Sequence, residues 1–319
     1  MSARYLVVDL GGSRARVATA DDELALSGRV EESTDHSRGP DSVVEQLVKL
    51  SRQSCDRSGI RVADIQLLVV ASPGPLDTTA GIVFDPPNLL GWKAVPLRDM
   101  LMAALGVPTV IVNDANVAAL GEFHFGAGRG TRNLVYLTIS TGIGGGVVVN
   151  GSLLAGTTGS GGELGHMTID RNGPLCPCGN IGCLEVLGSG RAIARRYAEG
   201  LAAQSGQAST GVALSAQDIA RRAATGDQMA REVFDDAMRA VGTGVVNCVN
   251  IFNPDVVVLG GGITNVGERL FSLVREMVGR YALPRPRAGV SVVPAQLGPD
   301  VGLIGAAGFA RAAGRASSS

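Results

Sequence analysis

The stretch Thr138–Gly151, TISTGIGGGVVVNG, is the part of the chain on which the fold prediction depends. Four glycines and two hydroxyl residues lie between the run NLVYLT, 133–138, and the run VVVN, 147–150, and each run predicts a strand. Because glycine has no Cβ to block close approach, the backbone N–H groups of such a turn can wrap an anion. A plain glycine-rich hairpin turn explains the same stretch about as well.

A second copy of this device begins the chain. Tyr5–Leu10 (YLVVDL) predicts a strand, the glycines after it predict a turn, and Arg16–Ala20 (RVATA) predicts a return strand. A strand, a polar or glycine junction and a helix also occur twice, over residues 109–122 and 255–270. The repeat predicts a duplicated two-lobe α/β fold, in which two anion-binding turns face each other across a cleft.

The repeat also predicts how the chain divides. A length of 319 residues allows about two domains. We expect a small N-terminal α/β lobe over residues 1–117 and a large C-terminal α/β lobe, with a metal site, over residues 118–301. The hinge is expected near residues 115–120. The final helix, 302–316, is expected to fold back onto the first lobe.

Between these motifs, apolar spacing predicts the remaining elements. Helices are expected over residues 41–58, 96–105, 191–206, 215–225, 227–252, 266–281 and 302–315, and buried strands over residues 66–71, 108–112, 255–259 and 290–293. Residues 81–92 predict a loop and residues 315–319 a frayed tail.

Composition narrows the class of protein. A net charge of -1 without an evident basic face argues against nucleic acid as a partner. The chain shows no signal peptide, and its apolar runs are too short and too broken for a membrane helix. Three of the five cysteines fall within eight residues, which favours a metal site in a reducing compartment. We therefore expect a cytoplasmic protein with no nucleic-acid or membrane partner.

Asp9 ends the first predicted strand, directly before the first glycine turn. A Mg²⁺ ion on the phosphates of a nucleotide needs a carboxylate nearby, bound directly or through water. Asp9 is therefore a candidate for the magnesium side of a polyphosphate site. The alternative is a turn-forming aspartate at a strand end.

Asp114 lies at the predicted junction between the strand 108–112 and the helix that begins at Ala115. Ligands in open α/β sheets bind at the carboxyl ends of strands. A carboxylate there can act as general base if an attacking hydroxyl comes within hydrogen-bond reach. Asn113 can donate and accept, which suits a sugar hydroxyl. The alternative for Asp114 is the N-cap of the helix.

Cys176, Cys178 and Cys183 form a compact C-x-C-x4-C cluster with glycines that allow tight turns. Three thiolates need a fourth ligand to complete tetrahedral zinc, and His166 in GELGHM is the candidate. Since four protein ligands leave no open coordination position, the sequence predicts a structural Zn²⁺ site.

Glu163 and Glu185 flank this cluster. Carboxylates beside a bound sugar accept hydrogen bonds from its hydroxyls and reject apolar ligands. Each glutamate can also be a solvated surface acid, and for Glu185 that is the preferred interpretation from the residue alone.

Together these motifs resemble the ROK family of sugar kinases and repressors, and within it the bacterial glucokinases, over nearly the whole chain. DLGGSRARVATAD resembles the family's first phosphate motif and STGIGGG its second. SPGPLDTTAGIVFDPPNLLGW resembles the sugar loop, and NDANVAALGE the segment with the catalytic aspartate. GELGHM and CPCGNIGCLE are similar to the ExGH and CxCGxxGCxE signatures, and VVVLGGGI to the adenosine-side glycine motif.

The resemblance implies an actin-like (ribonuclease H-like) fold and transfer of a phosphoryl group from ATP, with Mg²⁺, to the 6-hydroxyl of a hexose. Asp114 would be the general base. The residues implied near the sugar are Asn88, Asn113, Asp114, Glu163, His166 and Glu185. The residues implied at the nucleotide are Asp9, Gly11, Gly12, Ser13, Arg14, Thr141, Gly142, Gly144, Gly261 and Gly262. His166 would use one ring nitrogen for zinc and the other for the sugar. A homodimer or homotetramer is expected, because the family commonly forms them.

Two motifs depart from the family's pattern on the donor side. The first usually reads DxGGTK, and here Ser13 and Arg14 end it; the second usually begins GTG, and here Ser140 begins it. A specialised kinase for an amino sugar (kanosamine, N-acetylmannosamine or N-acetylglucosamine) or for a cyclitol therefore stays open. A non-catalytic sugar-responsive regulator is least expected, because the first strand begins by about residue 4 and leaves no room for an N-terminal helix-turn-helix.

Overall fold

A computed structural model describes residues 4–86, 88–205 and 214–316. The chain forms two compact units. Unit 1 comprises Met1–Arg129, Leu153–Gly161 and Leu297–Ser319, and unit 2 comprises Gly130–Ser152 and Gly162–Gln296. The boundary expected at residue 117 falls inside helix α3 (Asp114–Phe125), which belongs to unit 1 throughout.

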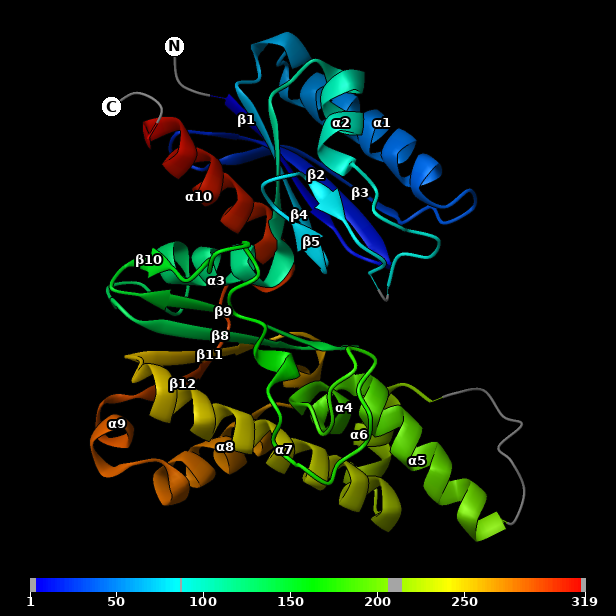
Figure 1. The fold of residues 1–319 in the computed structure, drawn as a ribbon, viewed down its shortest axis with the longest axis vertical. Coiled ribbons are helices and arrows are strands. Elements are labelled where there is room, and N and C mark those ends of the chain that lie inside the picture. Colours follow the sequence, from blue (N-terminus) through cyan, green and yellow to red (C-terminus); the bar gives the residue numbers. More distant parts are fainter. Residues whose placement is uncertain (1–3, 87, 206–213, 317–319) are drawn as a thin grey trace. The chain divides into compact units, whose positions relative to one another are not determined.

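The sheet of unit 1 combines a β-meander with two parallel strands (Figure 1). Its order is β3 (Leu26–Ser33), β2 (Arg14–Asp21), β1 (Arg4–Leu10), β4 (Leu67–Ser72) and β7 (Thr109–Asn113). β2 is antiparallel to both of its neighbours, whereas β1, β4 and β7 are parallel. The carboxyl ends of β1 and β7, which carry Asp9 and Asn113, therefore share one edge of the sheet.

Both faces of this sheet are covered, and β1 shows why. Successive side chains of a strand point to opposite faces. Leu6, Val8 and Leu10 pack in one core with α1 (Pro40–Ser58) and α2 (Leu97–Leu105), while Tyr5 and Val7 pack in a second core with α3 and α10 (Val301–Ala316). A small hairpin of β5 (Leu76–Asp77) and β6 (Ile82–Val83) completes the strands described in this unit.

Unit 2 repeats the pattern of an antiparallel hairpin followed by parallel strands. The sheet order is β10 (Ser152–Leu153), β9 (Ile143–Val149), β8 (Leu134–Ile139), β11 (Val256–Gly260) and β12 (Ser291–Pro294). β8 and β9 are antiparallel, and β8, β11 and β12 are parallel. The internal duplication predicted from the glycine turns is thus confirmed in the strand order.

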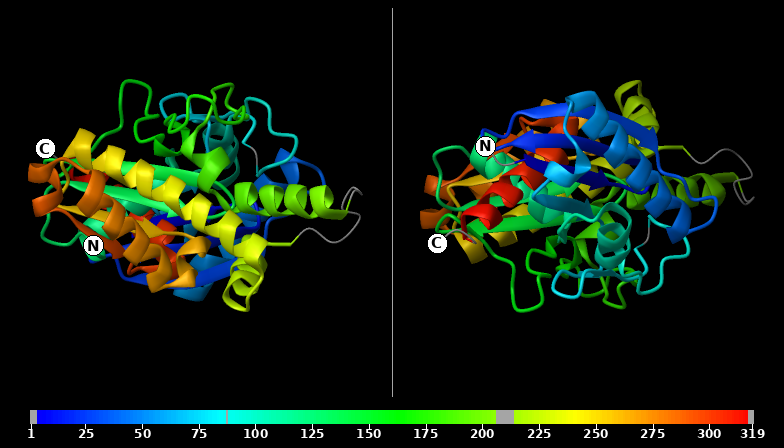
Figure 2. Two further views of the ribbon diagram at one scale, coloured as in Figure 1. Left: turned by 90° about the horizontal axis from the view of Figure 1, so that it is seen from below. Right: turned by 90° about the horizontal axis from the view of Figure 1, so that it is seen from above.

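Helices pack against one face of this second sheet. α7 (Gln228–Phe252) and α8 (Glu268–Tyr281) lie closest to the strands. α4 (Leu184–Gly188), α5 (Gly190–Ser205), α6 (Ala216–Ala224) and α9 (Pro284–Gly289) contact α7. The left view of Figure 2 shows α7 and α8 lying side by side across the strands. Their apolar faces share one core with β8 and β11.

The main differences from the sequence prediction lie at edges and ends. β3 was not predicted, because its partly exposed side chains include the charged Arg29 and Glu31 and lack an apolar run. β6 lies inside the predicted loop 81–92. Helix α10 continues to Ala316, so the prediction of a frayed tail is wrong for residues 315 and 316. Residues 317–319 of the predicted tail lie outside the described residues. The predicted end of one helix at Gly206 also lies outside them.

Within the described ranges, the helices are either too short or too polar to cross a bilayer.

Helices α3 and α10 cross at very close range because of glycine. A Cβ on Gly305 would lie well under 3.0 Å from the carbonyl oxygen of Val117. Gly305→Ala should therefore destabilise the protein by about 1–3 kcal/mol, since the backbones must separate. Gly279→Ala in α8 is the control, because its Cβ would meet nothing within 4 Å. That variant should be stabilised by about 0.4–1 kcal/mol. Thermal unfolding of both variants checks the pair, and equal shifts in Tm would contradict it.

Candidate functional site

The first glycine turn, Gly11–Ser13, joins β1 to β2 and is fixed through its carbonyl groups. Thr34 donates its hydroxyl to the Gly11 oxygen at 2.7 Å and its N–H to the Ser13 oxygen at 3.1 Å. The His36 Nε2 atom lies 2.7 Å from the Gly12 oxygen. Since Thr34 and His36 follow β3, this unpredicted strand is what secures the turn.

Asp9 lies beside this turn, paired with a cation. Arg16 donates to the Asp9 Oδ2 atom at 2.9 Å. Burial raises the pKa of the Asp9 carboxyl, while the charge and hydrogen bond of Arg16 act to lower it. The first turn of α10 also lies against this carboxylate, because a Cβ on Gly302 would come within 3.0 Å of it. Arg14, predicted at the nucleotide, is paired with Glu31.

Asn113 and Asp114 stand at the end of β7 and the start of α3. The Asn113 Oδ1 atom accepts hydrogen bonds from the N–H groups of Ala115, at 3.0 Å, and Asn116, at 3.1 Å. Asn113 is therefore the N-cap of α3. The alternative role considered for Asp114, that of the N-cap, thus belongs to its neighbour. Asp114 accepts from the Ala115 N–H at 2.8 Å through Oδ1.

Asn88, the remaining site residue predicted in unit 1, packs on the first glycine turn. Its backbone oxygen and Cβ occupy the space that a Cβ on Gly12 would need. Unit 1 thus brings Asn88 and the predicted nucleotide residues Gly11, Gly12 and Ser13 together.

The second glycine turn lies between β8 and β9 in unit 2 and is fixed to two helices. The N–H groups of Gly190 and Arg191, at the start of α5, donate to the carbonyl oxygens of Ser140 at 2.8 Å and Thr141 at 3.1 Å. The N–H of Ile143 donates to the Glu185 Oε2 atom, in α4, at 2.8 Å. These bonds hold the turn at the carboxyl end of β8.

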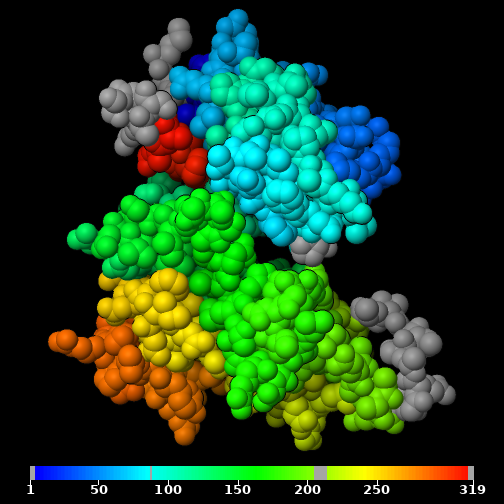
Figure 3. Space-filling view, in the orientation of Figure 1, coloured from blue at the N-terminus to red at the C-terminus, as the bar shows by residue number. Residues whose placement is uncertain are grey.

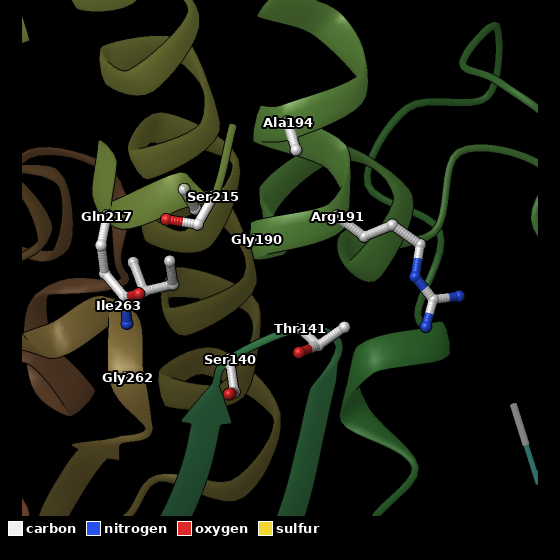
Figure 4. Close-up of a pocket in the computed structure, with 10 residues that line it drawn as sticks. Ser140, Thr141, Gly190, Arg191, Ala194, Ser215, Gln217, Gly262 and Ile263 are labelled. Atoms are coloured by element: carbon white, nitrogen blue, oxygen red, sulfur yellow. The ribbon is translucent and has the colours of Figure 1, made fainter. Parts of the chain in front are cut away.

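A cavity of about 250 Å³ opens beside this turn (Figure 4). It lies among the ends of β8 and β11 and the first turns of α5 and α6. Its lining residues are Ser140, Thr141, Gly190, Arg191, Ala194, Ser215, Ala216, Gln217, Gly262 and Ile263. Figure 4 shows Gln217 and Gly262 on one side and Thr141 at its base.

The predicted nucleotide residues of unit 2 meet at this cavity in part. Thr141 and Gly262 line it, whereas Gly142 and Gly144 belong to the adjoining turn and strand. Gly261, with φ of +87°, packs on the backbone of Ile139, where a side chain would clash. The lining residues from α5 and α6 were not predicted. A partial signal was present in the S-x-x-D capping box from Ser215, which marks a helix N-terminus.

His166, Cys176, Cys178 and Cys183 offer ligand atoms that all lie within 4.8 Å of one another. The Cys178 and Cys183 sulfurs are 3.7 Å apart, and the Cys176 sulfur is 3.7 Å from the His166 Nδ1 atom. Zinc–sulfur bonds of about 2.3 Å in a tetrahedron imply sulfur–sulfur separations of about 3.8 Å. The four donors therefore fit a zinc ion in both chemistry and spacing.

Glycines shape the segment that carries these ligands, which forms part of the surface of unit 2 seen in Figure 3. Gly182 has φ of +61°, and a Cβ there would collide with the carbonyl oxygen of Asp170. A Cβ on Gly165 would collide in the same way with the Ile143 oxygen. The ELGH segment is thus packed directly on β9.

Glu163 and Glu185 lie close to this cluster. The pKa of Glu163 is raised, first by burial of its carboxyl among protein atoms and further by the charge of Glu185, against a lowering by His166. Unit 2 therefore brings Glu163, His166 and Glu185 into one polar group, next to the zinc ligands.

Comparison with known proteins settles the family. The ROK family model matches residues 5–313 of this chain. The chain belongs to the ROK family. The family assignment made from the motifs is confirmed.

Two curated relatives match almost end to end. The glucokinase of Thermotoga maritima is 36% identical over 309 residues, which cover 95% of this chain and 96% of the relative. The N-acetylmannosamine kinase of Salmonella typhimurium is 33% identical over 302 residues, with coverage of 95% and 96%.

Two solved ROK structures share the fold. A ROK hexokinase from Thermus thermophilus superposes with a TM-score of 0.84 at 36% identity, covering 99% of this chain and 100% of that one. A ROK family glucokinase from Streptomyces griseus, in complex with glucose and AMPPNP, gives 0.80 at 29% identity, with coverage of 98% and 100%. The predicted actin-like (ribonuclease H-like) two-lobe α/β fold is confirmed.

Proposed function

We propose that this protein is an ATP-dependent hexose kinase that phosphorylates glucose, or a sugar of gluco configuration, at its 6-hydroxyl. The observation that carries the proposal is Asp114, a carboxylate at a strand end whose helix-capping role is taken by Asn113. Full-length relatives that are glucokinases support the reaction class, and so does the relative solved with glucose and AMPPNP. The protein is a sugar kinase.

Asp114 would act as general base. Phosphoryl transfer asks little covalent chemistry of the protein, so catalysis rests on positioning the hydroxyl and neutralising charge. One Asp114 oxygen is held by the Ala115 N–H, which orients the carboxylate. The carboxylate can accept the proton of the sugar's 6-hydroxyl as the hydroxyl oxygen attacks the γ-phosphorus.

The sugar would be held by amide, carboxylate and imidazole groups. These are Asn88, Asn113, Glu163, His166 and Glu185. The Asn113 oxygen already serves the helix, so its amide nitrogen is the group suited to donate to a sugar oxygen. His166 directs Nδ1 toward Cys176, and its Nε2 is therefore the nitrogen suited to a hydroxyl.

The nucleotide would use both glycine turns. Gly11, Gly12, Ser13, Thr141, Gly142 and Gly144 are proposed at the phosphates, and Gly261 and Gly262 at the nucleoside, beside the cavity of about 250 Å³. Arg14 is also proposed here, and it would have to exchange Glu31 for a phosphate. That competition is a physical reason to expect different donor behaviour from a lysine at the same position.

Two metals are part of the proposal. Mg²⁺ would neutralise phosphate charge, and Asp9 is the carboxylate suited to bind it. The Asp9 oxygens fit a Mg²⁺ site whose other ligands are phosphates and water. Zn²⁺ would be held by His166, Cys176, Cys178 and Cys183, whose spacing fits a closed tetrahedral site. With no open position, zinc would orient His166 and take no part in the reaction.

A coupled assay of ADP formation over a panel of sugars tests the acceptor. We expect glucose to give the highest kcat/KM. Glucose that lacks the 6-hydroxyl (6-deoxyglucose) should give no turnover. Glucosamine and the N-acetylated amino sugars serve as matched competitors. ATP consumption that no sugar stimulates would refute the proposed function.

A second acceptor class has a specific observation in its favour. The N-acetylmannosamine kinase relative is nearly as similar to this chain as the glucokinase relative. If an amino sugar or a cyclitol gives a higher kcat/KM than glucose in the same panel, the protein is a specialised kinase.

We further propose that the protein is cytoplasmic and forms a homodimer or homotetramer. Light scattering of the purified protein gives the mass of the oligomer.

A further inference from the structure

Glu185 makes a contact that sugar binding alone does not require. Its Oε2 atom accepts a hydrogen bond of 2.8 Å from the N–H of Ile143 in the second glycine turn. The same oxygen fills the space beside Gly142, where a Cβ would lie within 3.0 Å of it. Forty-two positions separate Glu185 from Ile143, so the fold, and not local sequence, creates this contact.

The contact ties together two parts of unit 2 that the proposed function assigns to different substrates. The glycine turn would serve the donor phosphates, and Glu185 would serve the sugar. A carboxylate has two oxygens, each able to accept hydrogen bonds. While Oε2 is committed to the turn, Oε1 has no hydrogen bond to any residue within the described ranges.

Unit 1 contains a parallel arrangement. Gly12 of the first glycine turn packs against Asn88, which is also a predicted sugar residue. In both units, therefore, a residue proposed to hold the sugar occupies the space left open by a glycine of a proposed phosphate turn. A side chain in place of either glycine would separate the two.

We propose that Glu185 is a positioning residue that couples the sugar site to the donor site, by holding the second glycine turn through the Ile143 N–H. This inference rests on the proposed function. A sugar hydroxyl that binds Oε1 fixes the carboxylate, and a fixed carboxylate fixes the turn that receives the phosphates. By linkage, sugar and nucleotide should each tighten the binding of the other by the same factor.

Binding of AMPPNP to the zinc-loaded full-length protein tests the proposal by calorimetry, without glucose and with saturating glucose. Without glucose, Glu185→Ala should bind AMPPNP about fivefold or more weakly than wild type, a factor within the usual range of coupling. Saturating glucose should change the AMPPNP affinity of this variant by only about onefold, that is, leave it unchanged. Glu163→Ala is the matched control. It removes an acid of the same polar group that has no hydrogen bond to the turn among the described residues, so it should weaken glucose binding and leave glucose-free AMPPNP binding unchanged.

Glu185→Gln separates the hydrogen bond from the charge. Its amide oxygen can still accept from Ile143, so glucose-free AMPPNP binding should stay within about twofold of wild type. Hydrogen exchange over residues 140–146 gives a nucleotide-independent measure. Exchange should accelerate in Glu185→Ala and stay unchanged in Glu163→Ala. If Glu185→Ala loses zinc or unfolds, Glu185→Asp replaces it, because its shorter carboxylate cannot span the same contact.

Two results would overturn the inference: wild-type AMPPNP affinity and exchange in Glu185→Ala, or equal losses in Glu185→Ala and Glu163→Ala. A wild-type protein that binds no AMPPNP would instead contradict the proposed function, so the two failures are distinguishable.

Discussion

Asp114→Asn should lower kcat for the sugar by about 10²–10⁴-fold, the usual contribution of a general base, and leave sugar binding largely intact. Asparagine has nearly the same shape, and its side-chain oxygen can still accept from the Ala115 N–H, as Asp114 does at 2.8 Å. The helix keeps its cap as well, because Asn113 supplies it. What is lost is an atom that can take the proton of the attacking hydroxyl.

Single-turnover kinetics and a sugar-binding measurement check this expectation together. Asp99→Asn in α2 is the control, because the Asp99 side chain is exposed. Asn116→Asp is not used, because the Asn116 side chain is buried. Asp99→Asn should leave kcat unchanged. Near-normal turnover in Asp114→Asn would remove Asp114 from the mechanism, while a parallel loss of sugar affinity would point to a binding role.

Cys178→Ala should reduce bound zinc from about one ion per chain to nearly none, lower Tm and weaken sugar binding. Structural zinc sites contribute about 10–16 kcal/mol of apparent binding free energy at pH 7, and one missing ligand of four forfeits much of it. The loss should reach the sugar through His166, whose Nδ1 atom lies 3.7 Å from the Cys176 sulfur. Without the metal, the ring loses the zinc bond that would fix its tautomer and direction.

Cys248→Ala is the matched control, because Cys248 is a fully buried cysteine of α7 outside the cluster. It should retain zinc and sugar affinity, with a modest loss of stability from the small cavity. Metal analysis, thermal unfolding and sugar titration on the two variants give the comparison. A metal-free Cys178→Ala protein that folds and works normally would falsify the structural role of zinc.

The sequence predicted those features that local pattern encodes. The two glycine turns, the strand-end position of Asp114 and the cysteine cluster all depend on neighbours within a few residues. The duplication could be inferred because the same local pattern occurs twice. These features were enough to place the chain in its family.

Features that depend on distant contacts could not be predicted. Nothing near Glu185 indicates that it binds the Ile143 N–H, and for the residue alone a surface acid was the preferred interpretation. Thr34 and His36 secure the first turn only because β3 pairs with β2, and β3 lacks an apolar run. The boundary of unit 1 lies beyond α3 because α3 packs on α10, which is encoded almost two hundred residues later.

Helix α10 also fixes the order in which the protein can be assembled at the ribosome. It covers the sheet face formed by Tyr5 and Val7, yet roughly 170 residues follow Arg129 before α10 begins, and their synthesis takes about 10–30 s at 5–20 residues per second. During this interval the nascent first unit has α3 on this apolar face but still lacks α10, while all of the second unit is made. The second unit is therefore synthesised completely before the first, and chains that end before α10 expose apolar surface of the kind that chaperones bind.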